Sequence, residues 1–355
     1  MSKLVCKKCV LDSEIPGIQI NEETGLCHFC ATYTPLSSQE KNEYLARIEE
    51  LFEQYGGKGN YDVVYALSGG KDSSYTLYKL KKDYPFLKVL AVQFDNGFIS
   101  ENAIMNAKKM CEITECDYFQ LTIEKKVLYD TFRKAAESYD AFPRFAKYRA
   151  SDICNICITI IKQKLIEQAI LQKAPFIVFA FTAGQSPNPI INLSVNFIQW
   201  SRSLFEKQLQ KIGIEDKDEI FLLKQEVLES IGENFPSILH PLCLWDYSED
   251  KVLETLLKIG WELPGINDSN STNCTLNSFA CYNHLKKYGF HPYAFDVAGL
   301  VRSGEMSREE GLEKINQELS QPLIEEAARK LKLKVKKSQK ILVKTESKEI
   351  TKNTR

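Results

Sequence analysis

A short polar segment between an apolar run and a helical pattern has the residue types that bind phosphate. It reads SGGKDS and comprises Ser68, Gly69, Gly70, Lys71, Asp72 and Ser73. The glycines let the backbone approach a ligand closely, and the next amides lie at a helix N-terminus, which attracts an anion. Lys71 adds a positive charge and the serines add hydroxyl donors. This pattern predicts a phosphate site that is neither a Walker A loop nor a dinucleotide-binding glycine motif, the plainer alternative being a serine-capped turn.

The eleven cysteines are the second feature that could take part in chemistry. Their odd number argues against a disulfide framework. Two C-x-x-C pairs near the N-terminus are spaced as in a zinc ribbon with four thiolate ligands. They are Cys6 with Cys9 and Cys27 with Cys30. Because so short a segment buries little apolar surface, zinc would supply its folding energy. We expect His28, between two ligands, to be a bystander.

A third C-x-x-C pair, Cys154 and Cys157, begins a predicted long helix, and Cys274 lies far downstream among polar turn residues. A helix N-terminus lowers the pKa of a thiol, so the pair is predicted to form reactive thiolates or ligands of a soft metal. Two alternatives stay open: small buried hydrophobic residues, or a second zinc site that includes Cys274 and Cys281. Burial is the expectation for the cysteines at 111, 116 and 243.

Strands and helices alternate from residue 61 onward. The predicted strands are 62–67, 88–94, 118–123 and 175–181, and the predicted helices between them are 73–82, 100–113 and 152–173. Continuous apolar strands separated by helices indicate an α/β fold with a parallel sheet and helices on both faces. The loops after such strands meet at one edge of the sheet, where ligands bind.

Composition shifts divide the chain into five parts. We expect a zinc ribbon at 1–36, a linker helix at 37–60, a nucleotide-binding domain at 61–190, a mainly helical region at 191–335 that completes the site, and a basic tail at 336–355.

The SGGKDS segment after a buried strand resembles the PP-loop of the N-type ATP pyrophosphatase (adenine nucleotide alpha-hydrolase) superfamily, which has a HUP-like fold. The resemblance spans roughly residues 60–190. It implies that the segment 68–73 binds the departing pyrophosphate of ATP, with Asp72 also a Mg²⁺ partner. It makes Asp95, in FDNGF, and Gly184, in FTAGQ, candidates near the nucleotide. FTAGQ departs from the Gly-His-Asn type sequence of the thiolases, and this weakens the case for Gly184 and Gln185 as nucleotide-binding residues.

In that superfamily an acceptor oxygen is adenylated and then replaced, and two resemblances differ on the replacing atom. The cysteines 154, 157 and 274 resemble the set that holds a 4Fe–4S cluster in tRNA 2-thiolation enzymes, which implies sulfur transfer through a cluster or a persulfide. The ribbon and the segment 300–315 resemble N-acetyl-sugar amidotransferases, which implies ammonia from a separate glutaminase subunit. We favour sulfur because three thiolates have a chemical task in that reaction. A non-catalytic nucleotide-binding assembly protein is a third alternative.

The acceptor is tRNA, a small metabolite or a nucleotide-linked sugar, and a sulfur donor or glutaminase is the expected partner. The net charge of −1 gives no reason to expect that the protein as a whole attracts nucleic acid. Arg144, Lys147 and Arg149, interleaved with aromatic residues, are either a contact for a phosphate-bearing acceptor or a solvated loop. No apolar run reaches bilayer length and no signal peptide is recognised, so we expect a cytoplasmic protein without membrane contact. A homodimer is compatible with the sequence.

Overall fold

Short apolar strands form a central, mostly parallel sheet in the order β3-β2-β1-β4-β6-β5. The computed structural model describes residues 3–139, 141–186, 188–215, 220, 235–263, 265 and 271–335. The strands are β1 (Val63–Ala66), β2 (Val89–Asp95), β3 (Asp117–Thr122), β4 (Phe176–Val178), β5 (Ile190–Asn192) and β6 (Ser237–Leu239). Among these described strands, only the pair β5–β6 is antiparallel. The predicted α/β class with a parallel sheet is confirmed.

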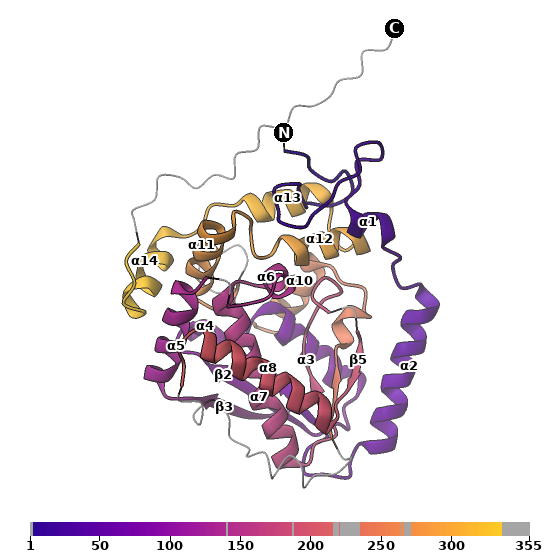
Figure 1. The fold of residues 1–355 in the computed structure, drawn as a ribbon. Helices are drawn as coiled ribbons and strands as arrows, with labels where there is room; N and C mark the ends of the chain where they lie inside the picture. Colours follow the sequence, from indigo (N-terminus) through magenta and orange to yellow (C-terminus); the bar gives the residue numbers. More distant parts are fainter. Residues whose placement is uncertain are drawn as a thin grey trace.

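Helices cover both faces because successive strand residues point to opposite sides. Val64 and Val92 face one core, which is closed by α5 (Lys125–Glu137), α7 (Asp152–Gln172), α8 (Val195–Lys211), α11 (Asn277–Tyr288) and α14 (Gln321–Lys330). Val63 and Tyr65 face the other core, which is closed by α2 (Ser38–Tyr55), α3 (Lys71–Asp83), α4 (Glu101–Thr114) and α10 (Glu249–Lys258). Figure 1 shows these helices around the sheet, with α2 running along one side.

The sheet extends beyond the predicted nucleotide-binding domain. All four predicted strands overlap observed ones, but β5 and β6 were not predicted, since strands of three residues give no periodic signal. Strand β6 lies in the region 191–335 that was expected to be mainly helical. Helix α6 (Arg144–Arg149) also occupies a stretch for which a loop was one of the alternatives. The expected basic tail at 336–355 lies outside the described residues.

The order of the strands fixes where a ligand can bind. Strand β1 lies between β2 and β4. From β1 the sheet continues through β2 to β3 on one side, and from β4 it continues through β6 to β5 on the other. In sheets of this kind the carboxyl ends of two such strands leave a crevice between their loops. The segment 67–70 after β1 and the segment 179–186 after β4 therefore lie at the position where ligands of open α/β sheets bind.

The N-terminal cysteine segment packs on the C-terminal helices α12 (Ala294–Ser303) and α13 (Arg308–Asn316). Leu11 of this segment and Val297 of α12 belong to one buried cluster. The Arg308 Nε donates to the carbonyl oxygens of Cys6 at 3.1 Å and Cys9 at 3.2 Å. In Figure 1 the indigo N-terminal segment accordingly lies beside α12 and α13. Among the described helices, none is long and apolar enough to cross a bilayer.

Candidate functional site

The SGGKDS segment forms a tight corner between β1 and α3. Gly69 has a φ of +77°, and a Cβ built there would lie 1.9 Å from the carbonyl oxygen of Ala103, so only glycine fits. Gly70 is the N-cap of α3, and the hydroxyls of Ser68 and Ser73 lie 2.9 Å apart. The corner thus combines a close backbone approach with a helix N-terminus, as a phosphate site requires.

A network of polar side chains surrounds Lys71. Its Nζ lies 2.8 Å from Asp72 Oδ1 and 2.7 Å from the hydroxyl of Tyr247, and that hydroxyl donates to Asp72 Oδ1 at 2.8 Å. Burial and the Asp72 carboxylate raise the pKa of Tyr247, so its hydroxyl stays protonated and keeps this donor role. Glu249 Oε2 lies 3.8 Å from Lys71 Nζ. No sequence pattern pointed to Tyr247, which lies after β6 and reaches the corner only through the fold.

The same corner opens into a cavity of about 330 Å³ that also contains the mid-chain cysteines. Its lining includes five residues of the phosphate segment, at 68 and 70–73, together with Cys154, Cys157 and Cys274. The structure therefore brings together two predicted groups of residues that are far apart in the sequence.

Cys274 reaches the cavity because backbone hydrogen bonds hold its segment against the loop after β2. Cys274 forms an isolated antiparallel bridge with Ile99. The amide of Ser100 donates to the carbonyl of Asn273 at 3.0 Å, and the amide of Thr275 donates to that of Phe98 at 2.9 Å. The segment 271–275 consequently covers the phosphate corner, where the Lys71 amide donates to the Thr272 hydroxyl at 3.3 Å.

Asn96 connects two of these thiols. Its Nδ2 lies 3.5 Å from Cys157 Sγ and 3.7 Å from Cys274 Sγ. The predicted helix start is confirmed, because Ser151 caps α7 by accepting from the Cys154 amide at 3.1 Å. The predicted lowering of thiol pKa is wrong for Cys157: burial raises its pKa, and this outweighs the hydrogen bond from Asn96.

Besides Gly69, two candidates taken from the resemblance do not line this cavity. Asp95 accepts a hydrogen bond from the Gly97 amide at 2.8 Å, which fixes the turn, and its neighbour Asn96 faces the cavity instead. Gly184 packs against α12, where a Cβ would lie 2.4 Å from the carbonyl oxygen of Asp296. Gln185 lines the cavity in its place.

The basic residues before α7 separate into different environments. Arg149 lines the cavity. Lys147 Nζ lies 4.4 Å from the centroid of the Tyr288 ring, and the Arg144 side chain lies near Gly17 in the N-terminal segment. Of the three, Arg149 alone is placed to contact a ligand in this cavity.

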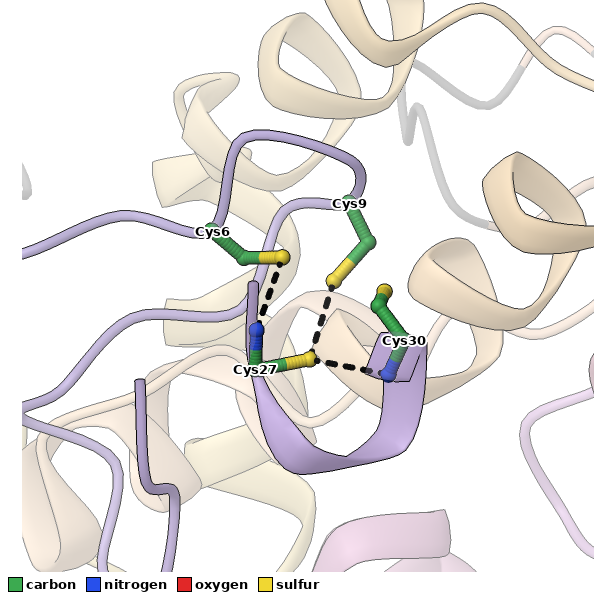
Figure 2. A group of neighbouring side chains, drawn as sticks. All are labelled: Cys6, Cys9, Cys27 and Cys30. Atoms are coloured by element: carbon green, nitrogen blue, oxygen red, sulfur yellow. Dashed lines mark hydrogen bonds between the residues drawn. The ribbon is translucent and has the colours of Figure 1, made fainter. Parts of the chain in front are cut away.

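The four N-terminal cysteines form a candidate metal site. Their Sγ atoms all lie within 4.8 Å of one another, all four are buried, and Figure 2 shows them pointing toward a common centre. Cys9 Sγ and Cys27 Sγ are 3.7 Å apart, close to the spacing of thiolates around a tetrahedral zinc ion, whose Zn–S bonds are about 2.3 Å long. Hydrogen bonding from Cys9 lowers the pKa of Cys27 to about 5. The donor set fits a structural metal ion.

The remaining cysteines lie elsewhere. Cys111 and Cys243 are buried in the core between the sheet and α3, and Cys116 packs at its edge. Cys281 is buried within α11 and does not line the cavity. Within the described ranges, the N-terminal set is the only group of three or more cysteine, histidine or acidic residues whose ligand atoms converge in this way. The second four-cysteine zinc site is therefore not assembled among these residues.

Residues 270–354 match the model of the LPS biosynthesis protein WbpG-like C-terminal domain. The matched range begins at the segment that covers the phosphate corner and includes Cys274. An uncharacterized protein of Methanocaldococcus jannaschii is 24% identical over 325 residues, which cover 90% of this chain and 94% of that protein.

Two solved structures are similar at low scores. The tRNA thiolase NcsA from Methanococcus maripaludis, solved with its 4Fe–4S cluster, has 18% identity and a TM-score of 0.36, and 88% of this chain matches 89% of it. The NMN synthetase from Francisella tularensis has 14% identity and a TM-score of 0.37, and 85% of this chain matches 98% of it. TM-scores this low carry no argument about the reaction.

Proposed function

We propose that this chain is an ATP-dependent enzyme that adenylates an acceptor oxygen and then replaces it. The segment 68–73 binds the pyrophosphate end of ATP, and the acceptor oxygen attacks the α-phosphorus while pyrophosphate leaves. One observation carries the proposal: the phosphate corner and three thiols from distant parts of the chain line the same cavity.

The polar network around Lys71 supports a role in holding phosphate. The Lys71 ammonium already has an anionic partner, Asp72, at 2.8 Å, so binding ATP exchanges one negative partner for another rather than burying a lone charge. Tyr247 donates to Asp72 and keeps the carboxylate in place. The carboxylates of Asp72 and Glu249 would hold Mg²⁺. The ion would neutralise negative charge on the phosphates.

We propose sulfur as the replacing atom. In this reaction the bond between the acceptor carbon and the adenylated oxygen breaks, a carbon–sulfur bond forms, and AMP leaves with the oxygen. Cys154, Cys157 and Cys274 would hold the sulfur source. It would be sulfide on the open iron of a cluster that they ligate, or a persulfide whose S–S bond a second of these thiols cleaves, leaving a disulfide that an external thiol reduces. An external donor would replenish the sulfur. Three thiols around one cavity support this assignment, because chemistry at the bound adenylate needs the sulfur nearby.

Nitrogen is the second candidate, and the family-model match favours it. The match at residues 270–354 is to an LPS biosynthesis protein, which points to a surface sugar as acceptor. Ammonia from a separate glutaminase subunit would then displace AMP. In that reaction the thiols would have a packing role, as the hydrogen bonds from Asn96 to two of them allow.

Adenylation is tested by ATP binding and pyrophosphate release. Lys71→Ala should weaken both by about 100-fold or more, because a charged contact to the departing pyrophosphate is lost. Lys82→Ala, at an exposed position on the same helix, is the matched control and should leave both unchanged. Equal pyrophosphate release by Lys71→Ala and Lys82→Ala would refute the phosphate role of the corner.

The replacing atom is tested on protein purified without oxygen. Sulfur transfer through a cluster predicts a brown protein whose iron content falls on Cys274→Ala but not on Cys116→Ala, a cysteine outside the cavity; transfer through a persulfide predicts a colourless protein whose thiolation, but not its adenylation, is lost on Cys274→Ala. A colourless protein with zinc but no iron, which forms AMP only when ammonia is supplied, would refute sulfur and establish nitrogen.

A further inference from the structure

A second chamber, of about 180 Å³, adjoins the cavity of the phosphate corner. The two share part of their lining, including Arg149, Phe181, Gln185 and Asp296. The far wall comes from α7 and α8, which contribute Lys162 and Gln208. A molecule in the main cavity could thus extend one group into this chamber.

Lys162 places a positive charge at the chamber wall. It lies on α7, and burial together with the charge of Arg149 lowers its pKa to about 8. Its Nζ lies 5.5 Å from the centroid of the Phe181 ring. Across the part of the chain that the structure describes, no carboxylate forms an ion pair with Lys162.

Arg149 is a second cation, and it lines both the main cavity and the chamber. No ion pair of its guanidinium is found among the described residues, although its charge acts on Lys162 and on Asp296. Asp296 is the acidic group that faces this junction, and it is a poor counter-ion. Burial raises its pKa to about 8, against the lowering effect of the Arg149 charge, so its carboxyl group holds a proton more readily than an ordinary aspartic acid does.

Two cations therefore meet at this junction, a half-buried one at Lys162 and an exposed one at Arg149. The half-buried ammonium group of Lys162 is partly removed from water, which is costly unless an opposite charge or hydrogen bonds compensate for it. The described residues supply the cations and a hydrogen-bonding amide, Gln185, but no anion that pairs with them. A ligand with a negative group would complete the arrangement.

We propose that Arg149 and Lys162 bind an anionic group of the acceptor, a carboxylate or a phosphate, and so direct its reactive oxygen toward the phosphate corner. The assignment of the ligand as the acceptor rests on the proposed function, whereas the anion site itself does not. An acceptor that lacks a negative group would leave both cations unpaired and would be bound poorly.

The test uses inorganic phosphate and acetate as separate probes, at constant ionic strength. The rise of the unfolding midpoint with probe concentration gives an apparent affinity for the folded protein. Both titrations are made on Lys71→Ala, which weakens binding at the corner of residues 68–73. Adding Lys162→Met should weaken the preferred anion by about 10-fold or more, since a charge-assisted contact is lost. Adding Lys162→Arg should retain most of the affinity.

Lys207→Met is the matched control, because Lys207 is exposed on α8 and does not line the chamber. Without any probe, Lys162→Met should be about as stable as its parent, since the half-buried ammonium group that is removed forms no ion pair among the described residues; this separates lost binding from lost folding. A larger effect with phosphate assigns a phosphate-bearing acceptor, and a larger effect with acetate assigns a carboxylate.

Unchanged affinity for both anions in Lys162→Met would overturn the anion site. This failure is distinct from failure of the proposed function. If Lys71→Ala keeps its pyrophosphate release while Lys162→Met loses anion binding, adenylation at the corner is refuted and the anion site stands.

Discussion

Replacing Gly69 with alanine tests whether the phosphate corner depends on a close approach of backbone to backbone. Gly69 has a φ of +77°, and a Cβ there would lie 1.9 Å from the Ala103 carbonyl oxygen. The obstacle is the backbone of α4 rather than a flexible side chain, so either the corner or the start of that helix must move.

The size of the effect follows from the bonds at this contact. The left-handed backbone alone costs alanine about 1 kcal/mol. Displacing the corner also strains the hydrogen bond from Trp261 Nε1 to the Gly69 carbonyl, at 3.1 Å, and that from Gln93 Nε2 to the Ala103 carbonyl, at 3.3 Å. Since each buried hydrogen bond contributes about 1 kcal/mol, the loss of unfolding free energy should reach about 3 kcal/mol.

The assay is urea unfolding of Gly69→Ala beside Gly289→Ala. Gly289 has a similar φ of +79° at the end of α11, but a Cβ added there would meet nothing within 4 Å, so it reports the backbone cost alone. The first variant should lose about 2 kcal/mol more than the second, and its ATP binding should fall with it. Equal losses in the two variants would refute the reasoning, because the contact with α4 would then carry no energy.

Three further outcomes follow from the site and its surroundings. Removing metal from the N-terminal cysteine set, by chelation or by Cys27→Ser, should lower the unfolding midpoint, since the segment folds around its ligands; loss of one zinc equivalent without a shift would contradict this. Tyr247→Phe removes the hydroxyl that contacts Lys71 and Asp72, so ATP affinity should fall by about 10-fold in a binding titration; unchanged affinity would mean that the hydroxyl does not organise the corner. Burial and the charges of Lys162 and Arg149 lower the pKa of His240 to about 4, below its unfolded value of about 6.5. Its contribution to stability is therefore complete above pH 6.5 and is lost as the pH falls toward 4, by about 3 kcal/mol at most, and His240→Gln should flatten this slope in urea unfolding measured between pH 7 and pH 4.

The sequence was most informative where the signal is local. The strands around 63–66 and 89–95 are continuous apolar runs followed by helical periodicity, and both were predicted within one or two residues. The spacing of the four N-terminal cysteines likewise predicted a ligand set that the fold brings within 4.8 Å. Patterns of this kind survive folding because neighbours along the chain stay neighbours in space.

The sequence was least informative where distant segments meet. Tyr247 and Trp261 contact the phosphate corner across more than 170 residues of chain, and neither has a local pattern that predicts it. The resemblance made Gly184 a candidate near the nucleotide, but in the structure Gly184 packs against α12. The pKa of Cys157 was misjudged because helix position is visible in the sequence whereas burial is not.

The sequence by itself determined the glycine corner at residues 68–73, the alternation of strands and helices, and the two groups of cysteines, since each depends on residue types at short spacing. Only the tertiary structure decided that Cys154, Cys157 and Cys274 share a cavity with the segment 68–73, and that Arg149 and Lys162 face an adjoining chamber. The physical reason is that strand order and the fastening of residues 271–275 to the loop after β2 arise from packing of the whole chain, which no short pattern encodes.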